Sequence, residues 1–282
     1  MKYLEVTLTV RPCNETVTDV LAALLGDIGF ESFVACEGGT KAYIQQSCFD
    51  EGQLQEVVDG FPLPDTAIDY TVSEAEDKDW NAEWEKNFFQ PIVIDNRCVI
   101  HSTFHKDYPP AEYDIVINPQ MAFGTGHHET TSSILGELLD ADLKGKSVLD
   151  MGCGTSILAI LASMRGAEKV TAIDIDDWCV NNSRDNIALN GITNITVELG
   201  DASLLKGRAP FDVIIANINR NILLRDLPAY AACMHAGSEI YLSGYYVEDI
   251  PAIRQKGESL GMVFDHFREK NNWVAVKMKN EE

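Results

Sequence analysis

A short glycine-rich stretch near the middle of the chain carries residue types that bind nucleotide-like ligands. An apolar run leads into Asp150, Gly152 and Gly154 follow, and a second apolar run covers 157–162. This order predicts a buried strand, a tight turn and a helix, with a hydroxyl residue of the pair 155–156 as the helix cap. Glycine at both turn positions lets the backbone bend sharply and approach a ligand without a Cβ in the way.

A second carboxylate, Asp174, follows the glycine turn at a sequence spacing that is typical of nucleotide-binding units. The apolar run 170–173 ends in Asp174, 20 residues after Gly154, where nucleotide-binding βαβ units place an acid that binds ribose. We therefore expect an adenosine-bearing ligand. Asp150 repels a pyrophosphate, and Ser156 stands where a third glycine is usual, so a cation such as S-adenosylmethionine is favoured over a dinucleotide. The alternative is a ligand-free α/β domain with tight turns.

Residues 118–131 form another glycine-rich segment, with hydroxyl side chains, ahead of a helical apolar pattern. Loops of this kind fold over ligands, with backbone N–H groups and threonine hydroxyls as donors. His127 and His128 are adjacent, so their side chains diverge on a regular element, and no metal site is expected. From the residues of this loop we expect contacts to the ligand from Phe123, Gly124 and Thr125.

Strands and helices alternate after Asp174, which predicts a doubly wound, mostly parallel sheet. The runs 263–267 and 273–278 flank a polar turn and predict a hairpin, so one edge strand is expected to run antiparallel. Ligands bind at the carboxyl ends of the strands in such sheets. The polar residues expected at four of these ends are Asp150, Asp174, Asp201 and Asn217.

The first third of the chain has a different pattern. Strand and helix signals follow the order β-α-β-β-α-β, which is typical of a small ferredoxin-like α+β domain, here assigned to 1–73. We assign 74–91 to a linker helix with an aromatic stripe (Trp80, Trp84 and Phe88), and 92–282 to the α/β domain. The front domain carries no histidine and only scattered acids, so we expect it to position a substrate or to be purely structural.

Composition limits the partners and the compartment. The chain has 282 residues and a net charge of −22, which opposes direct nucleic-acid binding and favours basic partners. Its seven cysteines are scattered without a C-x-x-C pair, as in a reducing compartment. Neither a leader peptide nor an apolar run of membrane-spanning length is recognised. We expect a cytoplasmic protein that does not bind membranes, and its oligomeric state stays open.

The stretches 148–154 and 172–176 resemble the seven-stranded S-adenosylmethionine-dependent methyltransferases, which have a Rossmann-like domain. The segment 121–131, with Asp79, Trp80, Trp84 and the front domain, is similar to the bacterial methyltransferases of large-subunit ribosomal protein eleven. This resemblance covers nearly the whole chain. It implies methylation of lysine ε-amines and of the N-terminal α-amine of a ribosomal protein, which the front domain recognises.

The resemblance also implies residue roles. The positions that match cofactor contacts are Thr131, Gly152, Asp174 and Asn217, beside Asp150, Gly154 and Asp201 from the strand-end argument. The chain departs from the family pattern at Gln120, at Ser156 and at Asn219-Arg220, and the last pair is expected to alter the substrate entrance.

For the chemistry, the candidate catalytic residue is Asn217, whose side chain or carbonyl could accept N–H bonds from the incoming amine. No general base is evident, so the amine is expected to lose its proton to water before transfer. Two alternatives remain from the residues: a methyltransferase of a small-molecule amine, and a non-catalytic regulator that binds an adenosine cofactor.

Overall fold

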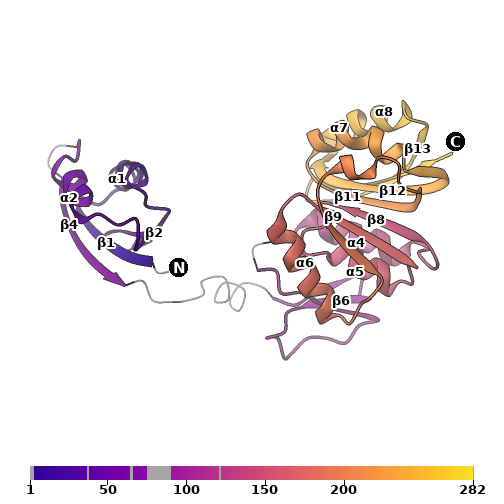
Figure 1. Ribbon diagram of the computed structural model, residues 1–282, viewed down its shortest axis with the longest axis horizontal. Helices are drawn as coiled ribbons and strands as arrows, with labels where there is room; N and C mark the ends of the chain where they lie inside the picture. The colour runs from indigo at the N-terminus through magenta and orange to yellow at the C-terminus, as the bar shows by residue number, and fades with distance from the viewer. Residues whose placement is uncertain (1–2, 37, 64–65, 75–89, 121, 282) are drawn as a thin grey trace. The chain divides into compact units, whose positions relative to one another are not determined.

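The computed structural model describes residues 3–36, 38–63, 66–74, 90–120 and 122–281. The chain divides into two compact units, residues 1–80 and 81–282, and each is described by itself (Figure 1). The expected linker helix and its aromatic stripe at Trp80, Trp84 and Phe88 lie outside the described residues. In the described part of the chain, no helix combines the length and apolar character needed to cross a bilayer.

The first unit is an antiparallel four-stranded sheet with two helices. Its strands lie in the order β2-β3-β1-β4, and its elements follow one another in the predicted order. Alternate residues of β1, from Val6 to Val10, turn one face of the sheet toward the helices, where they pack with Leu21, Leu25 and Leu54. The elements are β1 (Tyr3–Arg11), α1 (Glu15–Asp27), β2 (Ser32–Cys36), β3 (Gly39–Gln45), α2 (Glu51–Asp59) and β4 (Ala67–Glu74).

The second unit begins with a three-stranded sheet in the order β5-β6-β7 and continues with a seven-stranded sheet. The strands of the small sheet are β5 (Ile92–Ile94), β6 (Cys98–His101) and β7 (Tyr113–Val116). The strands of the large sheet are β8 (Ser147–Met151), β9 (Lys169–Asp174), β10 (Ile195–Leu199), β11 (Phe211–Asn217), β12 (Met234–Tyr246), β13 (Met262–Lys270) and β14 (Trp273–Asn280).

Helices cover both faces of the large sheet, as the alternation of its buried residues requires (Figure 1). In β8, Val148 points into the core with α4 (Glu129–Asp140), α5 (Ile157–Met164) and α6 (Asp177–Leu189). Its neighbour Leu149 packs into the other core, with α7 (Arg220–Ala231) and α8 (Ile250–Glu258). Two short 3-10 turns, η1 (Ala202–Leu205) and η2 (Val247–Asp249), lie between these elements. The predicted doubly wound α/β architecture is therefore confirmed.

The strand order corrects one expectation. The large sheet runs β10-β9-β8-β11-β12-β14-β13, and β14 is antiparallel to both of its neighbours. The antiparallel strand is thus the penultimate one, whereas the edge strand β13 runs parallel to β12. Side chains explain the choice between the two hairpin strands, because β14 buries Val274, Val276 and Met278 while β13 exposes charged residues such as Glu269 and Lys270 at the edge.

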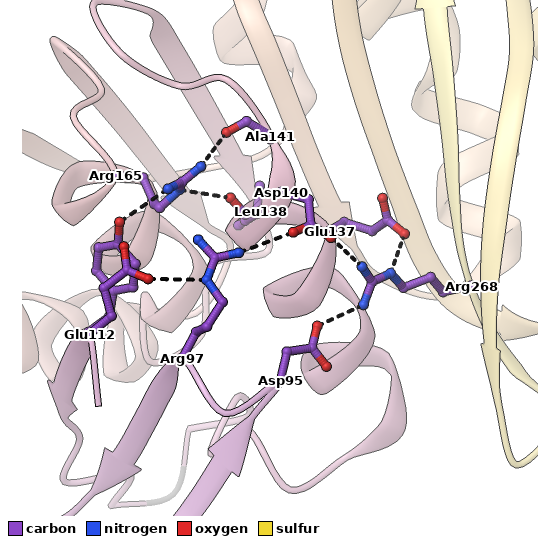
Figure 2. A network of polar contacts seen from close by, with 10 residues as sticks. Asp95, Arg97, Glu112, Glu137, Leu138, Asp140, Ala141, Arg165 and Arg268 are labelled. Atoms are coloured by element: carbon purple, nitrogen blue, oxygen red, sulfur yellow. Dashed lines mark hydrogen bonds and ion pairs between the residues drawn. The ribbon is translucent and has the colours of Figure 1, made fainter. Parts of the chain in front are cut away.

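Helix α4 is held by arginine side chains from two other segments (Figure 2). The guanidinium of Arg268, on β13, forms an ion pair with the buried Glu137, with Nε 2.7 Å from Oε1. It also contacts Asp95 at 2.9 Å and Asp140 at 2.7 Å. Arg97, the last residue of the turn between β5 and β6, reaches Asp140 at 3.1 Å. These contacts hold the helix against the small sheet and against the edge of the large one.

The C-terminal end of α4 is closed by a single arginine (Figure 2). Arg165 donates through Nε to the carbonyl of Leu138 at 3.2 Å and through Nη2 to that of Ala141 at 2.7 Å. These carbonyls lie where a helix end leaves its acceptors without intrahelical partners. The guanidinium therefore caps the helix whose other end faces the candidate site.

Candidate functional site

The two strand-end carboxylates lie at the same edge of the sheet because β8 and β9 are parallel neighbours. Asp174 is nearly buried, and it shapes the glycine turn directly: Oδ2 accepts the N–H of Gly154 at 2.8 Å. Its Oδ1 accepts the N–H of Asp176 at 3.1 Å. Each carboxylate oxygen keeps acceptor capacity beyond one bond, so Asp174 can hold the turn and accept hydroxyls of a ligand as well.

Asp150 sits in a different environment. Its side chain is fully buried, Oδ2 accepts the N–H of Ala159 at 3.2 Å, and Oδ1 has no hydrogen-bond partner among the described residues. Burial, together with the nearby charge of Asp174, raises the pKa of the Asp150 carboxyl to about 7. An unpaired buried carboxylate oxygen is costly, and a cation or a hydrogen-bond donor placed beside it would relieve that cost.

The glycines of the turn are required by close contacts as well as by backbone angles. Gly152 and Gly154 have φ values of +70° and +52°. A Cβ on Gly154 would lie 2.2 Å from the carbonyl oxygen of Phe123, and one on Gly152 would lie 2.4 Å from a side-chain carbon of Ile218. A larger residue at either position would therefore displace neighbouring chain segments.

The predicted helix cap is wrong at this turn. Ser156 precedes α5 with φ +62° and makes no side-chain cap. Its hydroxyl donates to Ser183 of α6 at 2.7 Å, and the hydroxyl of Thr155 donates to the carbonyl of Gly124 at 2.5 Å. Both hydroxyls form hydrogen bonds to segments that are distant in the sequence. A capping rule based on local sequence cannot predict such bonds.

The backbone N–H groups of this turn are all used within the protein. Those of residues 152 and 153 donate to the carbonyl of Ile173, and that of Gly154 donates to Asp174. Those of Thr155 and Ser156 donate to the carbonyls of Phe123 and Cys153. A pyrophosphate needs such N–H groups, so the turn is unsuited to a dinucleotide, while the unpaired Asp150 oxygen suits a cationic ligand.

The loop 118–131 lies directly on the glycine turn. Thr155 donates its N–H to Phe123 at 3.0 Å in addition to its hydroxyl bond to Gly124. The ring of Phe123 is 55% exposed, which leaves it available to a ligand. Thr125 contacts His127 within the loop, its hydroxyl oxygen 3.3 Å from the ring Nδ1.

Asn217 and Thr131 meet across the site. Asn217 ends β11, and its Nδ2 donates to the hydroxyl of the buried Thr131 in the first turn of α4, at 3.1 Å. This bond turns the amide oxygen of Asn217 away from Thr131.

Asp201, the fourth predicted strand-end residue, is exposed. Its carboxylate accepts the N–H of Ser203 at 2.9 Å, and the hydrogen bonds from Ser203 lower the pKa of the Asp201 carboxyl. Its cofactor contact stays a prediction.

Sequence reasoning missed an aromatic row beside the loop. The rings of Phe123 and His128 are 5.4 Å apart, those of His128 and Trp273 4.8 Å, and those of Trp273 and Tyr246 4.1 Å. His128 also caps α4 by accepting the N–H of Thr130. Next to the row lies a surface cavity of about 470 Å³ that is open to solvent. Its lining comprises Asn219, Arg220, Asn221, Gly244, Tyr245, Tyr246, Asp249 and Trp273.

This cavity includes the Asn219-Arg220 pair at which the sequence departs from the family pattern. Asn219 caps α7, and Arg220 forms a 2.6 Å ion pair with Asp249 across the cavity wall. The described residues contain no cluster of three or more side chains arranged to hold a metal ion.

Comparisons with known proteins show which family the chain resembles. The family model described as ribosomal protein L11 methyltransferase (PrmA) matches residues 31–281. Curated proteins named ribosomal protein L11 methyltransferase include one from Phocaeicola vulgatus, 79% identical over 98% of this chain and 99% of that protein, and one from Porphyromonas gingivalis, 49% identical over 98% and 97%. The crystal structure of a ribosomal protein L11 methylase from Lactobacillus delbrueckii subsp. bulgaricus has 29% identity and a TM-score of 0.63. It covers 68% of this chain and 99% of its own.

Proposed function

The chain belongs to the ribosomal protein L11 methyltransferase family, and from this premise we propose that it methylates lysine ε-amino groups and the N-terminal α-amino group of that ribosomal protein. When bound, S-adenosylmethionine supplies the methyl group from a sulfonium centre. The observation that carries the proposal is the buried, unpaired oxygen of Asp150 beside a turn whose N–H groups are all occupied. That combination favours a cationic adenosine ligand over a pyrophosphate compound.

The strand ends supply the groups that would hold the cofactor. Asp174 would accept the ribose hydroxyls, and the fully buried Asp150 would favour the positive end of the ligand through its charge rather than by direct contact. Gly152 and Gly154 let the ligand approach the backbone, and Thr131 lies under the site through its bond to Asn217. The loop residues Phe123, Gly124 and Thr125, with Asp201 beyond β10, complete the proposed set of contacts.

Asn217 orients the acceptor amine. With Nδ2 committed to Thr131, its amide oxygen or main-chain carbonyl accepts an N–H of the amine and directs the nitrogen lone pair. A lysine amine has a pKa near 10.4 in water, so it must lose a proton before it reacts, and water takes this proton. Alignment accordingly accounts for most of the rate gain.

Asn217→Ala tests this role. We expect turnover at saturating cofactor to fall by at least tenfold while the variant stays folded. Full turnover in the variant would remove Asn217 from the catalytic machinery.

The first unit serves as a ferredoxin-like substrate-recognition module in this proposal, with 1–73 as the module, 74–91 as the linker helix and 92–282 as the catalytic domain. The strand order β2-β3-β1-β4 around two helices supports the assignment. The net charge of −22 supports a basic protein partner and no direct nucleic-acid binding. The seven scattered cysteines, without a C-x-x-C pair, support action in the cytoplasm, where ribosomal proteins are made.

Mass spectrometry of ribosomal proteins from a strain that lacks this chain tests the function directly. We expect protein L11 to lose its methyl groups and to regain them when the gene is restored. Unchanged L11 would point to a small-molecule amine as the acceptor. If, in addition, labelled methyl donor showed no turnover, the chain would be a non-catalytic cofactor-binding regulator.

A further inference from the structure

Three asparagines along one side of α6 and its C-terminal cap are paired with backbone rather than with solvent. Asn182 and Asn186 lie one turn apart on the helix, and Asn190, four residues farther on, is its C-cap residue. The first two are buried and the third is half-buried. Burying an amide side chain costs free energy unless the amide is hydrogen-bonded. The partners of these three side chains therefore show what the row does in the structure.

The row pairs with the chain that leaves β7. Asn190 accepts the N–H of Val116 at 3.0 Å and donates to its carbonyl at 2.8 Å. One turn earlier, Asn186 accepts the N–H of Asn118 at 2.9 Å, and Asn182 donates to the carbonyl of Asn118 at 2.8 Å. The helix thereby offers residues 116–118 the bonding pattern that a neighbouring strand would offer.

Asn186 differs from Asn190 in one respect. Its Nδ2 also donates to the carbonyl of Thr155 in the glycine turn at 3.2 Å, and to Asn182 at 3.0 Å. The orientation of this amide is determined by its partners, because the N–H of Asn118 can only donate and the carbonyl of Thr155 can only accept. One fully buried side chain thus connects two parts of the candidate site.

The two connected parts already meet at another point. Asn118 begins the loop 118–131, and farther along the same loop Phe123 and Gly124 accept both donors of Thr155. The loop is therefore fixed to the glycine turn at one place and, through Asn186, at a second. Asn118 is held from its other side as well, since its side chain accepts the N–H of Thr103 at 3.2 Å.

We propose that Asn186 is a positioning residue, which holds the loop 118–131 and the glycine turn at the separation that the adenosine cofactor requires. The inference rests on the proposed function for the identity of that ligand. A pocket whose walls are held in place before binding loses less conformational freedom when the ligand enters, and affinity rises accordingly. Asn186 itself does not need to touch the ligand.

Three variants of the full chain test this role: Asn186→Ala, the near-isosteric Asn186→Asp, and Asn190→Ala as the matched control. The control removes the same side chain four residues farther on, at the C-cap of α6, but leaves the contact of Asn186 to Thr155 intact. Calorimetry with S-adenosylhomocysteine gives the dissociation constant, and thermal unfolding without ligand gives the stability. The ligand needs no acceptor protein and is not turned over, so the readout does not depend on activity.

We expect Asn186→Ala to weaken binding at least tenfold, and Asn186→Asp, which keeps an acceptor for Asn118 but loses the donor to Thr155, at least threefold. Asn190→Ala is expected to lower the melting temperature while binding stays within twofold. If Asn186→Ala does not fold, Asn186→Asp decides. Binding within twofold in the folded Asn186 variants, or equal weakening by Asn190→Ala, would overturn the inference alone. A wild-type protein that does not bind the ligand would overturn the proposed function too.

Discussion

Asp150 and Asp174 show how one residue type takes two roles from its surroundings. Both lie at the carboxyl ends of neighbouring parallel strands, at the same edge of the sheet. Asp174 accepts two backbone N–H groups, whereas Asp150 accepts one and leaves an oxygen unpaired. Asp174 therefore organises the glycine turn and is the proposed acceptor for the ribose, whereas Asp150 is a buried carboxyl group with one unpaired oxygen.

Asp174→Ala is expected to weaken cofactor binding at least tenfold. Hydrogen bonds to a charged acceptor contribute roughly 1.5–3 kcal/mol each, and about 1.4 kcal/mol corresponds to a factor of ten. Calorimetric titration with S-adenosylmethionine measures the change. Asp177→Ala, which removes the same charge from the exposed start of α6, serves as the control and should bind normally. Unchanged affinity in the Asp174 variant would place the ribose elsewhere.

Asp150→Asn is expected to change how stability depends on pH. The carboxyl has a pKa of about 7 in the fold, against an ordinary value of 3.8, so the folded state binds the extra proton between these values. Wild-type stability from this group is present below about pH 4 and is lost as the pH rises through 7. The variant has no such loss. Unfolding curves without ligand, at several pH values, should therefore show a smaller decline in stability between about pH 4 and pH 7 in the variant, and parallel declines would contradict the assignment.

At the scale of elements, α4 connects the site to the rest of the unit. Its first turn supplies Thr131 to Asn217, while its last turn is capped by Arg165 and flanked by Arg268 (Figure 2). The helix is thus anchored at the end remote from the chemistry. The charge at its buried face is Glu137, which also contacts His266 at 2.9 Å.

Arg268→Met is expected to destabilise the fold by about 3 kcal/mol, the low end for a broken buried ion pair, because it leaves the buried Glu137 without its guanidinium while Arg268 itself is partly exposed. Arg97→Met is the control, since its partners Glu112 and Asp140 are exposed and such pairs contribute about 0–1 kcal/mol. The double variant Arg268→Met with Glu137→Leu should recover part of the loss, because no unpaired charge remains. Denaturant unfolding measures all three, and equal losses in both single variants would refute the argument.

Local sequence patterns were sufficient to predict the elements that carry the site. Alternating apolar runs ending in Asp150, Asp174 and Asn217 located three strand ends, and the register of the sheet brings β9, β8 and β11 side by side. The patterns succeed here because strand burial and glycine turns are encoded within a few residues. The β13–β14 hairpin is also predicted from the sequence. The sequence does not predict that β14, rather than β13, pairs with β12.

Features that depend on distant partners were not predicted. The hydroxyls of Thr155 and Ser156 bond to Gly124 and Ser183 instead of capping α5, and nothing in the local sequence distinguishes these outcomes. Trp273 enters the aromatic row from a strand more than a hundred residues beyond the loop. The asparagine row of α6 did leave a signal, since polar residues at 182, 186 and 190 break the apolar face that a covering helix normally presents.

At the scale of the whole molecule, each unit has a separate hydrophobic core, so the two are expected to fold independently. A protein lacking residues 1–74 should therefore bind S-adenosylhomocysteine with near-normal affinity but lose methylation of ribosomal protein L11. Calorimetry and a labelled-methyl assay, with the full chain as control, measure the two properties. Retained protein methylation would show that the first unit is not the recognition module.

The net charge of −22 leads to a prediction about salt. Attraction between an acidic enzyme and the proposed basic substrate is screened as the Debye length falls from about 10 Å at 0.1 M to about 3 Å at 1 M salt. KM for the protein substrate should therefore rise with ionic strength. Binding of S-adenosylhomocysteine, which carries no net charge, should change less. A KM that is independent of salt would argue against electrostatic recognition.

The place of β14 inside the sheet affects how the chain is made. A ribosome produces β12 and β13 before β14, which lies between them, so both strands emerge without the neighbour that will join them. The nascent protein also lacks Trp273, and with it the centre of the aromatic row. A chain translated up to residue 272 therefore has strands with unpaired backbone N–H and C=O groups. A premature stop there would produce a substrate for chaperones and proteases rather than a shortened enzyme.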